Sequence, residues 1–284
     1  MRQSRTVIVT ALAALAGSVL VVTAASASPV AKTADSTWQT DGRVNAVAYS
    51  PDGKTLYLGG VFSHLCPALQ TTCDGTGPSD LTVHGLAAVD AATGQPRTGF
   101  LPEPDGEVSA LAVSPDGATL YAGGAFSHMN GAGAAGEVHR KLAAVSTSTG
   151  LAASSWSPVI NSSVRALALS PDASTLYLGG AFTTIDGAQR LKLAAAGAYS
   201  AAAPSFSLLG WAPDARGSKT VDKRSVVPPT VSSLAVRPDG DVYAGGVFTT
   251  IAGATRNNVA ALSPATGGAP ATARPRSRRR PPPA

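Results

Sequence analysis

The segment VNAVAYSPDGKTLYLGGVF occupies residues 44–62, and the chain carries four versions of it. The same order of apolar residues, a Pro-Asp turn, a Tyr and paired glycines returns at 108–126, 164–182 and 231–248. Each version continues to Leu-Ala-Ala-Val or a close variant, at 86–89, 142–145, 193–196 and 259–262. Repetition of this kind predicts a repeat protein, in which each unit buries its apolar face against the next unit.

Alternation within the segment indicates β-strands. Small residues at 108, 110 and 112 alternate with Ser109, Leu111 and Val113, and side chains two apart share one face of a strand. Because nearly every position is apolar, we expect both faces of each strand to be covered by neighbouring sheets. The alanines on one face leave room for larger side chains of the next sheet.

Turn residues separate the first two strands of a unit. In Ser-Pro-Asp-Gly, at 50–53 and 114–117, Pro fixes φ, Asp bonds the local backbone and Gly accepts a positive φ, so a hairpin is predicted. The third unit has Ala173 at the glycine position, where we expect strain. The second strand, 55–62 in the first unit, ends in Gly-Gly, which would let a neighbouring backbone approach closely.

Two further strands complete the predicted unit. The Leu-Ala-Ala-Val segment is the third strand, and the segment around an aromatic residue, usually followed by Pro, is a short fourth. These aromatics are Trp38, Phe100, Trp156 and Trp211. The Ala-rich stretch 191–203 would be helical by propensity, but its place in the repeat predicts a strand.

Four strands in a unit of about 55 residues are typical of a β-propeller blade, so an all-β propeller of four recognisable four-stranded blades is predicted. The units lie near 38–99, 100–155, 156–210 and 211–268. The ring is either closed and small, or a fragment of a larger one. Trp38 could close it by adding the missing fourth strand to the last sheet.

The repeats resemble the delta-60-type propeller blades of exported, actinobacterial-like proteins. The resemblance rests on Leu-Tyr-x-Gly-Gly-x-Phe, on Leu-Ala-Ala followed by Thr-Gly, and on Gly-x-x-Arg at 187–190 and 253–256. It covers residues 38 to about 268 and implies a propeller fold. It implies no shared catalytic residues, because function resides in sites and not in the scaffold.

The amino terminus has the pattern of a signal peptide. Arg2 and Arg5 precede an uncharged run at 7–25, and Ala-Ser-Ala at 25–27 offers a cleavage site. We expect removal of residues 1–27, a short linker at 28–37 and a secreted chain without a membrane span; an uncleaved anchor is the alternative. In an oxidising compartment, Cys66 and Cys73 are expected to form a disulfide.

The net charge of +5 comes from the chain ends. Five arginines lie within residues 274–280, in a stretch at 269–284 that has no counterpart in the repeats. We interpret this stretch either as a disordered basic tail or as the product of a shifted reading frame. Nucleic-acid binding through the tail is a third functional hypothesis, but without these ends the charge is close to balanced, so no nucleic-acid partner is expected.

Few residues suggest a chemical function, and the sequence contains no familiar cofactor-binding or metal-binding motif. His84 and His139 lie in two long inserts, with Arg140 beside the second, and Arg190 and Arg256 recur in the last two units. These five are the candidate ligand contacts. His64 and His128 share one repeat position with threonines, which suggests a simple polar role. The acidic cluster Glu103, Asp105 and Glu107 is interpreted as a solvated turn; carboxylate pairs can also cleave glycosides.

The sequence therefore predicts an exported, non-catalytic module that binds extracellular glycans or a surface protein through its inserts at 63–85 and 127–141. Rigid strands hold such variable loops in a fixed relation. The alternative is a secreted carbohydrate-active hydrolase or lyase that uses the propeller funnel. Ligand identity and oligomeric state do not follow from the sequence.

Overall fold

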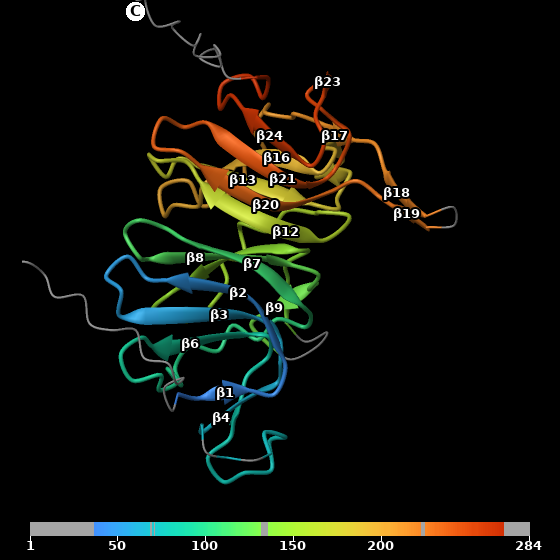
Figure 1. Ribbon diagram of the computed structural model, residues 1–284. Helices are drawn as coiled ribbons and strands as arrows, with labels where there is room; N and C mark the ends of the chain where they lie inside the picture. The colour runs from blue at the N-terminus through green and yellow to red at the C-terminus, as the bar shows by residue number, and fades with distance from the viewer. Residues whose placement is uncertain (1–36, 69, 71, 132–135, 223–224, 270–284) are drawn as a thin grey trace, which may run out of the picture. The chain divides into compact units, whose positions relative to one another are not determined.

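The structure, a computed structural model, describes residues 37–68, 70, 72–131, 136–222 and 225–269. The signal peptide predicted at 1–27, nearly all of the linker and nearly all of the basic tail lie outside these residues. All regular elements in the described ranges are β-strands (Figure 1). A helix long and apolar enough to span a membrane is not found among them.

Four antiparallel three-stranded sheets repeat along the chain, each with its second strand at the centre. Their strands are, in sheet 1, β2 (Arg43–Tyr49), β3 (Thr55–Val61) and β6 (Leu86–Asp90); in sheet 2, β7 (Val108–Val113), β8 (Thr119–Gly124) and β11 (Leu142–Ser146); in sheet 3, β12 (Val164–Leu169), β13 (Thr175–Gly180) and β16 (Leu193–Gly197); in sheet 4, β20 (Thr230–Val236), β21 (Val242–Val247) and β24 (Val259–Leu262). The first three predicted strands of each unit are thereby confirmed, including the strand in the Ala-rich stretch.

Shorter strands lie mainly in the segments that join the second and third strands of each sheet. They are β1 (Gln39–Thr40), β4 (His64–Cys66), β5 (Leu81–Thr82), β9 (His128–Met129), β10 (Glu137–Val138), β14 (Thr184–Ile185), β15 (Ala188–Gln189), β17 (Ala215–Arg216), β18 (Lys219–Asp222), β19 (Ser225–Val227), β22 (Thr250–Ile251) and β23 (Ala254–Thr255). They form small antiparallel pairings such as β4 with β5 and β9 with β10.

The paired glycines have two different roles. A Cβ on the second glycine, Gly60, would overlap the carbonyl oxygen of Arg43, because β2 has a bulge at this point. A Cβ on the first glycine, Gly59, would lie 2.7 Å from Cγ1 of Val108 in the next sheet. The second position therefore permits the predicted close backbone approach, and the first is a socket for a neighbouring side chain.

This socket recurs between consecutive sheets. Gly123 faces Val164 and Gly179 faces Val231, each with 2.7 Å between the added Cβ and the valine Cγ1. The first strands follow one another in the same order, β2 beside β7, β7 beside β12 and β12 beside β20. We call the side of each sheet that carries the socket its Tyr face, and the side that carries the inserted valine its Val face.

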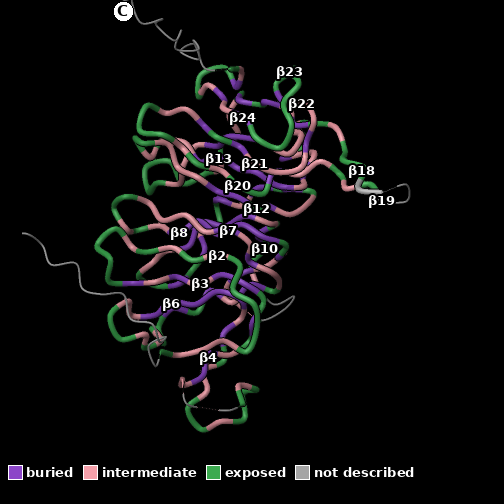
Figure 2. The backbone as a smooth tube through the Cα atoms, viewed as in Figure 1, coloured by how far each residue is buried: buried purple, intermediate pink, exposed green. Residues whose placement is uncertain are grey.

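Each interface between sheets is a hydrophobic cluster of repeated composition. Between sheets 1 and 2, the Tyr face contributes Tyr57, Leu86 and Ala88, and the Val face contributes Val108 and Leu111. The equivalent residues fill the clusters between sheets 2 and 3 and between sheets 3 and 4. The buried segments in Figure 2 follow the strands of these sheets. The prediction that small side chains on one sheet receive larger ones from the next is confirmed.

The predicted fourth strand requires correction. Its aromatics do not form strands; Phe100, Trp156 and Trp211 instead pack against the tyrosine of the preceding sheet, with ring centroids 5.5, 5.5 and 5.0 Å apart. The third strand of a sheet instead forms a single bridge with a residue that lies a few positions before the aromatic, such as Val89 with Pro96. An aromatic side chain stabilises the interface more when its ring is buried between sheets than when it lies on an exposed edge strand.

The predicted closure through Trp38 is also wrong. The segment after Trp38, β1, pairs with β4, and Trp38 packs against the apolar cluster of sheet 1. One face of sheet 1 is consequently not covered by a neighbouring sheet of the described chain. On β2, Val47 and Tyr49 are 62% and 61% exposed, so the expectation that both strand faces are covered fails for sheet 1.

Candidate functional site

A cleft of about 400 Å³ lies at the junction of sheets 1 and 2, where the insert 63–85 begins and ends. Its lining residues include three acids, Asp41, Asp105 and Glu107, and one histidine, His84. We call it the rim cleft. Its residues come from the ends of paired strands and from the segments that enter sheets 1 and 2.

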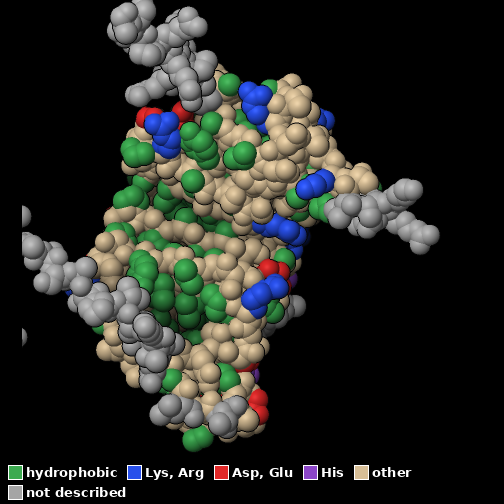
Figure 3. Space-filling view, viewed as in Figure 1, with side chains coloured by type: hydrophobic (Ala, Val, Ile, Leu, Met, Phe, Trp, Pro, Cys, Tyr) green, Lys and Arg blue, Asp and Glu red, His purple; other side chains and the backbone are tan. Residues whose placement is uncertain are grey.

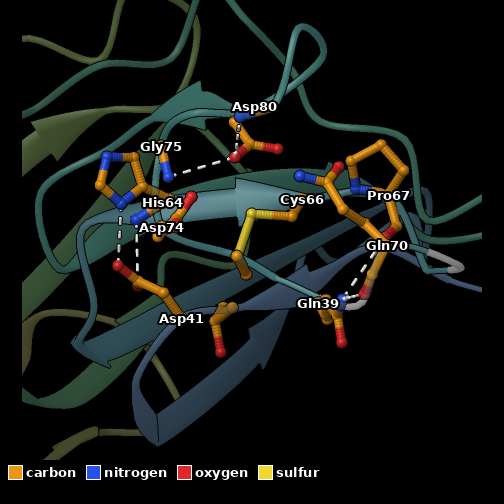
Figure 4. The surroundings of a disulfide bond; sticks show 12 residues. Gln39, Asp41, His64, Cys66, Pro67, Gln70, Asp74, Gly75 and Asp80 are labelled. Atoms are coloured by element: carbon orange, nitrogen blue, oxygen red, sulfur yellow. Dashed lines mark hydrogen bonds and ion pairs between the residues drawn. A yellow bond between two sulfur atoms is a disulfide. The ribbon is translucent and has the colours of Figure 1, made fainter.

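Asp41 fixes the start of the insert. Its Oδ1 accepts hydrogen bonds from the backbone N–H groups of Ser63 and His64, at 2.7 and 3.0 Å, and its Oδ2 lies 2.9 Å from Nδ1 of His64. Figure 4 shows this pairing beside the disulfide. One carboxylate thus satisfies two backbone donors and orients the imidazole, so the loop has a defined starting geometry.

The same arrangement recurs in the second and third repeats. Asp105 accepts from the backbone N–H groups of Ser127 and His128 at 2.6 and 2.9 Å, and its Oδ2 lies 2.8 Å from His128 Nδ1. Asn161 Oδ1 accepts from two consecutive N–H groups in the same way. Sequence reasoning missed this clamp, although Asp41, Asp105 and Asn161 all lie three residues before the socket-filling valine position of their repeat.

The clamp keeps both carboxylates ionised. Partial burial alone would raise the pKa of Asp41, but the backbone and ring hydrogen bonds from His64, with that from Ser63, lower it below its ordinary value. For Asp105, burial acts in the same direction and is outweighed by the bonds from Ser127 and His128, so its pKa is also lowered. A carboxylate with a lowered pKa is a hydrogen-bond acceptor and a poor general acid at neutral pH.

Glu107 is the most accessible acid of the rim cleft. Its Oε1 accepts from Asn45 Nδ2 at 2.9 Å and from Ser109 Oγ at 3.1 Å, and Arg43 lies 3.6 Å away. These partners come from both sheets, so the carboxylate bridges their junction. Its side chain is 36% exposed, which leaves acceptor capacity for a ligand.

The insert next to the rim cleft is cross-linked. Cys66 and Cys73 form a disulfide with a Cα–Cα distance of 5.7 Å. Around it, Gln39 Nε2 donates to the carbonyl of Gln70 at 2.8 Å, and Asp80 Oδ2 accepts from Gly75 N–H at 3.1 Å (Figure 4). The disulfide and these bonds thus tie described parts of the insert to one another and to β1 beside the cleft.

The two insert histidines are placed differently. His84 lines the rim cleft, whereas His139 is fully buried and neither of its ring nitrogens has a hydrogen-bond partner in the part of the chain that the structure describes. Burial lowers the pKa of His139, although Glu137, 3.7 Å away, acts in the opposite direction. Arg140 is exposed and does not line the rim cleft.

The recurrent arginines bond to backbone carbonyls. Arg190 donates to the carbonyls of Gln189 and Leu209, both at 2.8 Å, and Arg256 donates to that of Thr255 at 2.8 Å. Arg190 therefore ties the β14–β15 hairpin to the segment that follows sheet 3. Across the described ranges, no group of three or more His, Cys, Asp or Glu side chains is arranged to hold a metal ion.

One family model matches part of the chain. The family model of a β-propeller domain of unknown function matches residues 237–264, which include all of β21, β22, β23 and β24. No curated protein matches this chain. The β-propeller repeat character of the sheets agrees with this match.

Solved structures with a similar arrangement are remote. Hydrazine synthase of Kuenenia stuttgartiensis has 17% sequence identity and a TM-score of 0.46, over 79% of this chain and 47% of that one. The WD40 repeats of RRP9 and the structure of U3-55K have 11% and 12% identity and TM-scores of 0.38, each over 80% of this chain and 54% of theirs. The chain thus spans about half the length of these proteins.

Proposed function

We propose that this chain is an exported, non-catalytic β-propeller module that binds an extracellular glycan in the rim cleft. The observation that carries the proposal is the cleft itself, which is lined by Glu107, His84 and the two clamped aspartates, Asp41 and Asp105. Sugar hydroxyls donate well to fixed carboxylate oxygens, and sites with a few well-placed polar groups on a rigid scaffold are typical of small-ligand recognition.

The proposed scaffold is a propeller of the delta-60 type, with the four sheets as its blades. The socket-and-valine stacking supports this, because it repeats the same contact between successive sheets. Clamps at Asp41 and Asp105 hold the inserts at one end of these sheets. Ionised aspartates with lowered pKa favour binding over acid catalysis in the cleft.

Export is proposed from the basic start, the apolar run and the Ala-Ser-Ala site at 25–27. The disulfide between Cys66 and Cys73 suits an oxidising compartment. Expression in a secreting bacterium tests this step: we expect the protein in the medium with Ser28 as its first residue. Retention in the membrane with an intact amino terminus would contradict it.

A glycan array probed with the full chain tests the ligand. We expect binding to a defined glycan class, weakened about tenfold or more by Glu107→Gln or His84→Ala, since a hydrogen bond to a charged group contributes about 1.5–3 kcal/mol. Glu137→Gln, which changes an exposed acid outside the rim cleft, is the matched control. Silence on the array, or equal loss with the control, would reject the glycan proposal.

A further inference from the structure

Sheets 1 and 4 each present one face that the other interfaces bury. On the Val face of sheet 1, Val44, Val47 and Tyr49 are 37%, 62% and 61% exposed. The residues at the same repeat positions in sheet 2, Val108, Leu111 and Val113, all belong to the cluster between sheets 1 and 2. Hydrophobic side chains gather over β2 and β3 (Figure 3).

The Tyr face of sheet 4 is exposed in the complementary way. Val259 is 61% exposed and Tyr243 is 38% exposed, whereas the equivalent residues of sheet 3, Leu193 and Tyr177, are 0% and 3% exposed. The atom nearest to a Cβ on Gly245 would be Oγ of Ser233 in the same sheet, which takes the place that a valine of the next sheet has at the equivalent glycines. In the other three sheets the equivalent glycine faces a valine of the next sheet.

The packing of a tyrosine against an aromatic residue, which occurs in each interface between sheets, is missing from the exposed faces of sheets 1 and 4 where the structure describes the chain. Tyr57, Tyr121 and Tyr177 each pack against the aromatic that precedes the next sheet. Tyr243 has no such ring against it among the described residues. Trp38, the aromatic before sheet 1, lies beside a hollow of about 590 Å³ over the Val face.

We infer that two copies of this chain associate head to tail, with the Val face of sheet 1 of one copy against the Tyr face of sheet 4 of the other. The contact continues the interface already present between successive sheets, with Val44 in the Gly245 socket and Trp38 against Tyr243. Within the described ranges each copy has one exposed face of each kind, so two copies can cover all four faces. The pair would hold eight sheets, within the usual range of propellers.

A second copy is the occupant that these faces fit best, because they repeat both halves of one interface. The interface between sheets is apolar and packed around a valine in a glycine socket, and the Val face of a second copy supplies this shape. A face-to-face pair would instead place Tyr49 against Tyr49 and would bring no valine to Gly245. The inference does not depend on the glycan proposal.

Site-specific cross-linking of the full chain tests the contact. In the existing interface, a Cβ on Gly123 lies 3.2 Å from Cβ of Val164, close to the separation in disulfides. We expect a mixture of Val44→Cys chains and Gly245→Cys chains to form a disulfide-linked pair under mild oxidation, with neither variant doing so alone. Cross-linking of Val44→Cys with itself, or no cross-linked pair in the mixture, would overturn the inference.

A second experiment places opposite charges on the two faces and measures the mass of the assembly by sedimentation. We expect the wild type to have the mass of two chains, and Val47→Lys or Val259→Glu alone to weaken association about a hundredfold or more, because a buried unpaired charge is costly. Mixing the two variants should restore the pair. Val226→Lys, at a residue 60% exposed on β19, is the control and should leave association unchanged. A single-chain mass, a larger polymer, or no recovery on mixing would contradict the head-to-tail pair.

Discussion

Gly123→Ala should destabilise the fold by forcing sheets 2 and 3 apart. The new Cβ would lie 2.7 Å from Cγ1 of Val164 and 3.3 Å from Cδ1 of Leu167, whereas carbon atoms in contact prefer about 3.5–4.0 Å. Val164 is fully buried and Leu167 is 9% exposed, so neither can rotate into solvent. The sheets must therefore shift by about 1 Å at this point, as the shortfall in distance indicates.

Overpacking of this kind costs about 1–3 kcal/mol. Alanine returns up to about 1 kcal/mol by restricting the unfolded chain, so we expect the free energy of unfolding to fall by about 1–2 kcal/mol. The assay is urea unfolding, in which the midpoint should fall at an unchanged slope. Gly99→Ala is the control, because a Cβ there meets no atom within 4 Å.

Val164→Ala in the Gly123→Ala background should relieve the clash. Its cost should be smaller than in the wild type, with a coupling free energy of about 1 kcal/mol. If Gly123→Ala were as harmless as Gly99→Ala, or if the two changes at the interface were additive, the socket would not be occupied by Val164 and the stacking would be refuted.

Other predictions address the turns, clamps and cross-link. Ala173 has φ of +56°, so Ala173→Gly should raise the free energy of unfolding by about 0.5–1 kcal/mol, measured by urea midpoint; a fall would contradict strain at this turn. Because the folded pKa of Asp105 is below the ordinary 3.8, its stabilising effect is present above that value and is lost as pH falls through the folded pKa. Asp105→Asn should therefore fold, as Asn161 makes the same bonds, and should flatten the acid limb of a thermal-stability profile; an unchanged limb would reject the clamp. Replacing Cys66 and Cys73 together by Ser should cost about 2 kcal/mol and speed proteolysis of the 63–85 insert, and equal proteolysis rates would show that the disulfide does not hold it.

Repetition made most of the fold predictable. The strand at 193–197 shows this, because helix propensity was overruled by its place in the repeat, and β16 pairs with β13 there. The strain expected at Ala173 appears as a left-handed backbone. The first depends on comparing the repeats with one another and the second on local backbone chemistry, and one sequence displays both.

Contacts between residues distant in the chain were harder to predict from the sequence. The sequence marks Phe100 and Trp156 as repeated aromatics, but only the stacking of sheets shows that they pack on tyrosines instead of forming strands. Closure through Trp38 failed for the same reason, since the pairing of β1 with β4 depends on how the insert folds back. Of the candidate ligand contacts, only His84 lines the rim cleft, because burial of His139 and the carbonyl bonds of Arg190 depend on neighbours distant in the chain.

The stacking of the sheets is tested most directly by nuclear Overhauser effects between the socket glycines and the valine methyl groups of the following sheet. The structure predicts cross-peaks from Val108 to Gly59, from Val164 to Gly123 and from Val231 to Gly179, where the added Cβ would lie 2.7 Å from a methyl carbon. Observation of all three would establish that the sheets follow one another Val face on Tyr face. Their absence in a folded sample, with the valine methyl groups contacting only their own sheets, would contradict it.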